Sequence, residues 1–144
     1  MENISIKNIK MNQTAQDWQQ ALTITCNVLV ESGSITNEYT KACIDSVLEY
    51  GPYIVLSPGF ALAHSRPSEA VIKSDMSLVV FDNDILFGSD NDPVRVIICL
   101  ACTDNIQHVE RLSKIGEKMF EDEHLIEKII QCKTLEDISI LING

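Results

Sequence analysis

The chain has 144 residues, of which 45% are hydrophobic and 22% are charged, and its formal net charge at pH 7 is −10. This length fits one ordinary domain with its own core. The acidic balance argues against nucleic acid or an anionic membrane surface as a partner, since both favour a basic patch. No apolar run approaches the roughly 20 residues of a membrane span, and the N-terminus lacks a secretory pattern. We therefore expect one domain over residues 1–144, located in the cytoplasm and not inserted in a membrane.

The first third of the chain predicts a strand followed by two helices. The strand is expected at Ile4–Lys10. Thr14-Ala-Gln-Asp17 resembles a capping box at a helix start, and apolar residues then recur at helical spacing as far as Ser32-Gly33. A second helix is expected over residues 36–49, because Gly51-Pro52 stops it.

The middle of the chain predicts strands. They are expected at Tyr53–Leu56, Phe60–Ala63, Met76–Phe81 and Val94–Ala101. The last of these segments is almost continuously apolar, which is typical of a central strand covered on both faces. Asp82–Asp84 and Ser89–Pro93 are rich in turn-forming residues, and their acids lack the spacing of a calcium-binding loop.

Three further helices are expected at residues 105–120, 122–131 and 134–142, with Thr134 as the cap of the last one. Helices therefore precede and follow the strands along the chain. This order favours an α/β fold in which helices cover the faces of one sheet.

The sequence holds five cysteines, Cys26, Cys43, Cys99, Cys102 and Cys132. The first two lie on apolar helix faces, where a free cysteine behaves as a small hydrophobic residue. Cys99 and Cys102 form a C-x-x-C pattern inside the predicted buried strand, whereas a redox site of that pattern needs an exposed cysteine near a helix start. We expect these four cysteines to pack in the core rather than to serve as a redox or metal site, and the cysteine content fits a reducing cytoplasm.

His64 directly follows a predicted strand, in the segment PGFALAHSRP over residues 58–67. The prolines on both sides restrict the backbone and would hold the side chain at the sheet edge. A core histidine bonded to a carbonyl fits the same local pattern. From this segment alone the two interpretations stay open.

His108 adds a second imidazole, because it lies in the first turn of the helix that follows Val94–Ala101. Unpaired N–H groups and the positive dipole end there disfavour an imidazolium and favour an anion. If Phe60–Ala63 and Val94–Ala101 are neighbouring strands, His64, His108 and Arg66 meet at one sheet edge. Such a group suits attack by a neutral imidazole on a phosphoryl group. His124 lies among acids at a helix start and is expected to be solvated surface.

Three segments carry a family resemblance: GPYIVLSPGFALAHSRP at residues 51–67, FGSDNDPV at 87–94 and LACTDNIQHVERL at 100–112. They resemble the enzyme IIA components of the bacterial phosphoenolpyruvate-dependent sugar phosphotransferase system, of the mannitol/fructose type. The resemblance covers essentially the whole chain, and it is greatest to the branch that acts on L-ascorbate.

This resemblance implies a mixed central sheet flanked by helices on both faces, a three-layer α/β/α domain. It implies a phosphotransferase that receives a phosphoryl group from the carrier HPr and passes it to a cysteine of the cognate enzyme IIB, which serves the membrane enzyme IIC. The phosphorylated histidine corresponds to His64 and the supporting histidine to His108. Ser65 and Arg66 are predicted to stabilise the phosphoryl group, and no metal or other cofactor is expected. Phe60, Leu62 and Ile106 are expected to form an apolar rim.

Two positions depart from the family pattern. Ala63 stands where a proline commonly precedes the active histidine, so this strand end is expected to be less rigid. Ser46 stands where mannitol-type members carry an arginine late in the second helix, and Arg66 is predicted to replace that arginine.

Two alternatives stay open at this point. One is a regulatory protein of the same fold, whose phosphorylation state controls a partner rather than transport. The other is a silent binding module in which His64 is structural. Phosphorylation separates the second alternative from a carrier, and a transport-specific enzyme IIB acceptor separates the first.

Overall fold

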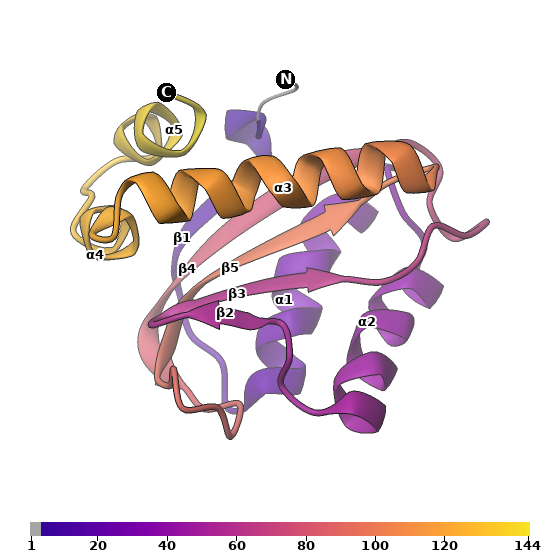
Figure 1. The fold of residues 1–144 in the computed structure, drawn as a ribbon, viewed down its shortest axis with the longest axis horizontal. Coiled ribbons are helices and arrows are strands. Elements are labelled where there is room, and N and C mark those ends of the chain that lie inside the picture. Colours follow the sequence, from indigo (N-terminus) through magenta and orange to yellow (C-terminus); the bar gives the residue numbers. More distant parts are fainter. Residues whose placement is uncertain (1–3) are drawn as a thin grey trace.

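A five-stranded sheet separates two helical layers in the computed structural model, which describes residues 4–144 (Figure 1). The strands are β1 (Ile9–Gln13), β2 (Val55–Ser57), β3 (Phe60–His64), β4 (Asp75–Ile85) and β5 (Val94–Ala101). The helices are η1 (Ile6–Asn8), α1 (Trp18–Glu31), α2 (Asn37–Tyr50), α3 (Asn105–Glu121), α4 (Leu125–Ile130) and α5 (Leu135–Asn143). Helices α1 and α2 cover one face of the sheet, and α3, α4 and α5 cover the other.

The strand order is β1-β4-β5-β3-β2, and the sheet is mixed. Strand β5 is antiparallel to β4 and parallel to β3, while β1 is parallel to β4 and β2 is antiparallel to β3. As its apolar sequence predicts, β5 is central, and every one of its residues except Arg95 is buried. The expected α/β class with helices on both faces is thus confirmed.

Alternate residues of the central strands serve two separate cores. In β5, Ile97 and Cys99 face the α1/α2 layer, while Ile98 faces the α3/α4/α5 layer. In β3, Leu62 also faces the α3 side. Because His64 is two residues beyond Leu62, the same alternation directs its side chain toward the α3 side of the sheet.

Two expected elements near the N-terminus are corrected. Instead of a strand over Ile4–Lys10, a 3₁₀ turn precedes β1. Asn8 is fully buried in that turn, where its side chain donates to both carboxylate oxygens of Asp75 at 3.2 Å and accepts from the Ser32 hydroxyl at 2.6 Å. These bonds satisfy the hydrogen-bonding groups of a buried polar side chain.

The first long helix begins three residues later than the capping box at Thr14 predicts. Asp17 is the N-cap, and its carboxylate accepts from the backbone N–H of Gln20 at 2.8 Å. The Gln20 side chain in turn accepts from the backbone N–H of Gln16 at 2.6 Å. A reciprocal cap therefore exists, but it is built on Asp17 and Gln20.

The predicted turn at Asp82–Asp84 is wrong, because these residues continue β4 to Ile85. Asp84 accepts from Arg95 of β5 at 2.7 Å, and the Asn83 side chain pairs with the backbone of Ala15. Tertiary partners here override the low strand propensity of Asp and Asn. The turn-rich segment Ser89–Pro93 does form a loop.

Along residues 4–144, the helices fall short of the length and apolar character that crossing a membrane requires. Strand β2 and helix α4 are also shorter than the sequence predicts. Neither difference changes the order of the elements. The remaining helices match the expected ranges to within a few residues.

Candidate functional site

The two histidines singled out by the sequence meet at one edge of the sheet. Strands β3 and β5 are parallel neighbours in continuous register, with His64 opposite Leu100. Helix α3 follows β5 after a short connection and carries His108 in its first turn. The ring centroids of His64 and His108 are 5.5 Å apart, with 48° between the ring planes. The predicted convergence of the two imidazoles is therefore present in the fold.

An open cavity of about 620 Å³ lies over this edge. Its lining combines the end of α2, the segment after it, the end of β3 and the start of α3: Ser46, Glu49, Tyr50, Tyr53, His64, Ser65, Arg66 and His108. All four residues predicted from the sequence are in this set. Arg66 is exposed and brings a fixed positive charge to the cavity, whereas Glu49 brings a negative one.

One hydrogen bond of His64 defines which ring nitrogen can react. Its Nδ1 lies 2.8 Å from the carbonyl oxygen of Leu62. Because a carbonyl only accepts, Nδ1 carries the proton in the neutral ring and Nε2 carries the lone pair. The carbonyl bond expected of a purely structural histidine is thus present, yet the same bond prepares Nε2 as a nucleophile beside the cavity.

His108 is held in a neutral state by its surroundings. Partial burial lowers its pKa below the ordinary value, and the neighbouring His64 lowers it further. Its Nδ1 is buried and has no hydrogen-bond partner among the described residues. The expectation of a disfavoured imidazolium agrees with this direction, although burial, not the helix end, is the main cause.

The start of α3 differs from its expected role as an anion site. The Asp104 carboxylate caps the helix by accepting from the backbone N–H of Gln107 at 2.8 Å. A negative group from the chain itself therefore already occupies this helix end.

The rim of the cavity is aromatic, which the sequence reasoning missed. Phe60 and Leu62 were expected there, but both are fully buried in the core. Tyr53 instead packs edge-on against His64 with centroids 5.7 Å apart, and Tyr50 packs edge-on against Tyr53 at 6.4 Å. The motif Tyr50-Gly-Pro-Tyr53 was the available signal, because two exposed tyrosines around a turn favour an interaction surface.

The two departures from the family pattern lie where the sequence places them. Ser46 of α2 lines the cavity. Ala63 is fully buried and pairs with Cys99 in the β3–β5 ladder. Backbone pairing therefore extends through Ala63 to His64 at this strand end.

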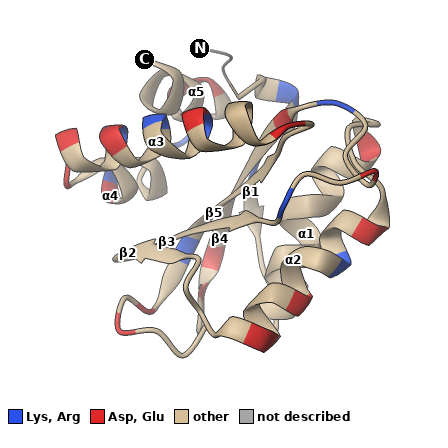
Figure 2. Ribbon diagram, turned by 45° about the vertical axis from the view of Figure 1, so that its right-hand side comes forward, with Lys and Arg blue, Asp and Glu red and all other residues tan. Residues whose placement is uncertain are grey.

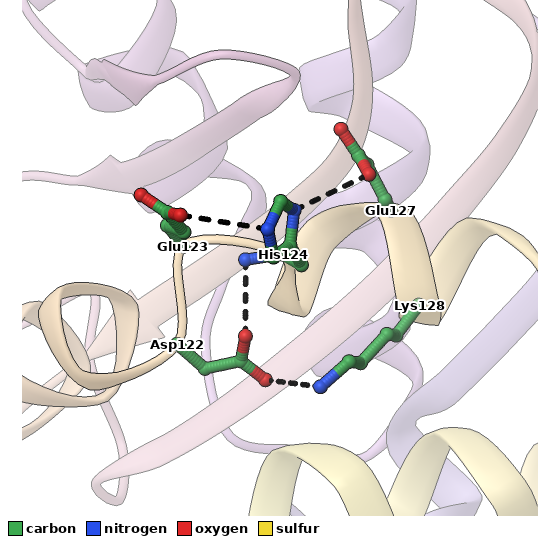
Figure 3. Close-up of polar contacts among 5 residues, drawn as sticks. All are labelled: Asp122, Glu123, His124, Glu127 and Lys128. Atoms are coloured by element: carbon green, nitrogen blue, oxygen red, sulfur yellow. Dashed lines mark hydrogen bonds and ion pairs between the residues drawn. The ribbon is translucent and has the colours of Figure 1, made fainter.

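The third histidine, His124, lies at the start of α4 and not in the cavity (Figure 3). Its ring is exposed between Glu123 at 3.4 Å and Glu127 at 3.6 Å. Asp122 accepts from the His124 backbone N–H at 3.0 Å and pairs with Lys128 at 2.8 Å, which lowers the pKa of the Asp122 carboxyl. The expectation of a solvated surface histidine is confirmed.

The cysteines are all free thiols. Cys99 faces the α1/α2 core and Cys102 the opposite core, so the C-x-x-C pattern does not bring the two thiols together. Burial of both agrees with the expected packing role. Across residues 4–144, His, Cys, Asp and Glu side chains form no cluster of three or more that could hold a metal ion.

Two imidazoles and a guanidinium thus meet at the edge of an α/β sheet, an arrangement whose chemistry can support group transfer. Comparison with known proteins gives its class. Residues 2–144 match the family model of the phosphoenolpyruvate-dependent sugar phosphotransferase system, EIIA 2. The chain belongs to this family, whose members are phosphotransferases that carry phosphohistidine.

Individual relatives agree with the family. The chain is 35% identical over 138 residues to the ascorbate-specific PTS system EIIA component of Escherichia coli K12, covering 95% of this chain and 90% of that protein. The crystal structure of PtxA from Streptococcus mutans, assigned to the PTS IIA proteins, superposes with a TM-score of 0.88 at 33% identity, covering 99% of this chain and 94% of that one.

The same fold occurs in a complex. Enzyme IIA of mannitol from Escherichia coli, solved with its phosphorylated enzyme IIB, superposes with a TM-score of 0.86 at 21% identity, covering 99% of this chain and 98% of that one. At this identity the likeness concerns the fold alone.

Proposed function

We propose that residues 1–144 act as one phosphoryl-carrying domain in the cytoplasm. In this proposal His64 accepts a phosphoryl group from phospho-HPr and passes it to a cysteine of the cognate enzyme IIB. The observation that carries the proposal is the Nδ1 contact of His64 with the Leu62 carbonyl, which leaves the Nε2 lone pair beside a cavity shared with His108.

The transfer follows from this tautomer. The Nε2 lone pair of His64 forms a bond to phosphorus while the P–N bond of the donor phosphohistidine breaks, and that electron pair returns to the donor ring. While Nδ1 keeps its proton, the phosphorylated ring is positively charged, and the Leu62 carbonyl stabilises that charge. In the second transfer a cysteine thiolate attacks the phosphorus, and the electron pair of the Nε2–P bond returns to His64.

In this proposal, the groups around His64 stabilise the negative charge on the phosphoryl oxygens. Neutral His108 can donate one N–H to them without placing a second positive charge beside the His64 ring. Arg66 supplies a guanidinium from the exposed side of the cavity, and the Ser65 hydroxyl supplies a further donor. In this arrangement Arg66 replaces the arginine that Ser46 displaces from the second helix.

The surface charge favours a basic donor protein. Acidic residues lie on both helices that flank the cavity, α2 and α3 (Figure 2). Together with a net charge of −10, this field would accelerate encounter with a basic patch on HPr and would weaken as salt is added. Nucleic acid is not a partner in this proposal.

We propose L-ascorbate as the sugar, imported by a membrane enzyme IIC. The support is the relatives at about a third identity that are named ascorbate-specific, such as the one from Escherichia coli. The domain itself need not touch the sugar, because it hands its phosphoryl group to enzyme IIB. A regulatory protein would share the phosphorylation of His64 but not this acceptor.

Intact mass after incubation with phosphoenolpyruvate, enzyme I and HPr tests the proposal. We expect one acid-labile phosphoryl group on the wild type, none on His64→Ala and slower addition to His108→Ala. His124→Ala is the matched control and should behave as the wild type. An unchanged wild-type mass with active HPr would overturn the carrier function. Transfer onward to an ascorbate-type enzyme IIB, but not to a mannitol-type one, would support the sugar assignment.

A further inference from the structure

Tyr39 links its own helix, α2, to the end of β5 and to the residue that follows β3. Its side chain is fully buried, and its hydroxyl reaches the edge where β3 and β5 end. The hydroxyl oxygen accepts from the backbone N–H of Ser65 at 2.9 Å and donates to the carbonyl of Leu100 at 2.7 Å. Ser65 is the residue directly after His64, so this tyrosine acts next to the proposed nucleophile.

The Tyr39 hydroxyl lies where the next hydrogen bond between β3 and β5 would be. The last paired residues of β3 and β5 are His64 and Leu100. Beyond them the chain after β3 leaves the sheet, and the Ser65 N–H needs another acceptor. A hydroxyl offers one proton and two lone pairs, so it can accept from one strand and donate to the other. Tyr39 thereby ties the first residue beyond β3 to β5.

The Tyr39 hydroxyl keeps the proton that it donates in this bridge. Burial raises the pKa of the Tyr39 hydroxyl well above its ordinary value, so the proton stays on the oxygen. The carbonyl oxygen of Ser65, at 3.1 Å, is a second acceptor within reach of the same proton. Both acceptors belong to the edge that carries the cavity.

Hydrogen bonds therefore hold both the ring of His64 and the backbone that follows it. Its ring is held by the Leu62 carbonyl at 2.8 Å, and the peptide that follows its Cα is held by Tyr39. Together these contacts define the direction of Nε2. We propose that Tyr39 is a positioning residue, whose hydroxyl anchors the Ser65 peptide and thereby holds Nε2 of His64 in line for phosphoryl transfer. The reaction that this positioning serves is the proposed function above.

Tyr39→Phe tests the proposal, because it keeps the ring and removes the hydroxyl. Ser77→Ala is the matched control: Ser77 is also fully buried, and its hydroxyl donates to the Thr25 carbonyl at 2.8 Å away from the cavity. Both variants lose one buried hydroxyl-to-carbonyl bond, and Tyr39→Phe also removes the acceptor of the Ser65 N–H. We therefore expect the urea midpoint of unfolding to decrease in both variants and to decrease more in Tyr39→Phe.

Three readouts separate positioning from core packing. In Tyr39→Phe alone, the ¹⁵N shifts of the His64 ring should move away from the pure Nδ1–H tautomer. The rate of phosphorylation at saturating phospho-HPr should fall about tenfold, with an unchanged half-saturating concentration. In the wild type, the Ser65 amide should be protected from hydrogen exchange although it lies beyond the strand. This last measurement decides the case if Tyr39→Phe does not fold.

Several outcomes would overturn the inference. One is a Tyr39→Phe protein whose His64 shifts and transfer rate match those of Ser77→Ala, which would make Tyr39 a filler of the core. Rapid exchange of the Ser65 amide in the wild type is another. If the wild type accepts no phosphoryl group but the His64 shifts still respond to Tyr39→Phe, the proposed function fails while the positioning role stands.

Discussion

The two ends of helix α3 present histidines in opposite settings. At its first turn, His108 is half-buried and packs against His64. Among the residues that line the cavity, only Glu49 carries a carboxylate. Just beyond its last turn His124 is exposed between two glutamates. The first environment lowers the imidazole pKa and suits phosphoryl chemistry, whereas the second is solvated surface. In the proposed function, the role of each imidazole therefore depends on the groups that the sheet edge places beside the ring, and a position at a helix start is not sufficient.

The largest expected effect separates His64 from His124. His64→Gln removes the Nε2 lone pair at the proposed attack position, so phosphorylation by phospho-HPr should fall by at least about a thousandfold. His124→Gln should leave the rate unchanged. Rapid-quench single-turnover kinetics measure both. Equal losses in the two variants would contradict the contrast between the cavity and the exposed surface around His124.

Arg66 should produce the next largest effect. Arg66→Ala removes the guanidinium that we propose contacts the phosphoryl oxygens, and we expect a rate about ten- to a hundredfold lower. Arg66→Lys should recover only part of it, because an ammonium cannot make the bidentate contact. Arg95→Ala is the control, since that guanidinium binds Asp84 outside the cavity. An unchanged rate in Arg66→Ala would show that Arg66 does not replace the missing arginine.

A pH dependence sharpens the comparison further. The pKa of His108 is lowered in the folded chain by burial and then by His64, so the unfolded chain binds its proton first as the pH falls. Stability is then lost on going from about pH 7 toward about pH 5, where the unfolded state holds more protons. His108→Asn should show a smaller loss of urea midpoint over this interval than the wild type does. A midpoint that falls equally in both proteins would contradict the buried, neutral state of His108.

The smallest effect is expected for His124, which lies between Glu123 and Glu127 just beyond the end of α3. His124→Ala removes ring contacts with Glu123 and Glu127 that are open to solvent, and exposed pairs of this kind contribute little. The melting temperature should change by less than about 2 °C. Differential scanning calorimetry measures the shift. A clear loss of stability would show that the cluster in Figure 3 supports the fold.

Local patterns were sufficient where one segment determines its own structure. The continuous apolar run of Val94–Ala101 predicted a central strand, and the 3.6-residue periodicity predicted α1 and α2. Local patterns failed where distant partners decide. Asp82–Asp84 resembles a turn, yet Arg95 and Ala15 hold it in β4. The buried polar contacts of Asn8 likewise replace a predicted strand with a turn.

The features of the site can likewise be separated into those that local sequence predicted and those that depend on distant partners. The sequence by itself determined that His64 ends a strand, that His108 begins a helix after another strand and, through family resemblance, that both belong to a phosphotransferase. Only the tertiary structure decided that β3 and β5 are parallel neighbours, that Tyr53 rather than Phe60 lines the cavity, and that Tyr39 anchors the Ser65 peptide. The reason is physical: periodicity reports which face of one element is apolar, whereas strand order and cross-element hydrogen bonds arise only when the whole core packs.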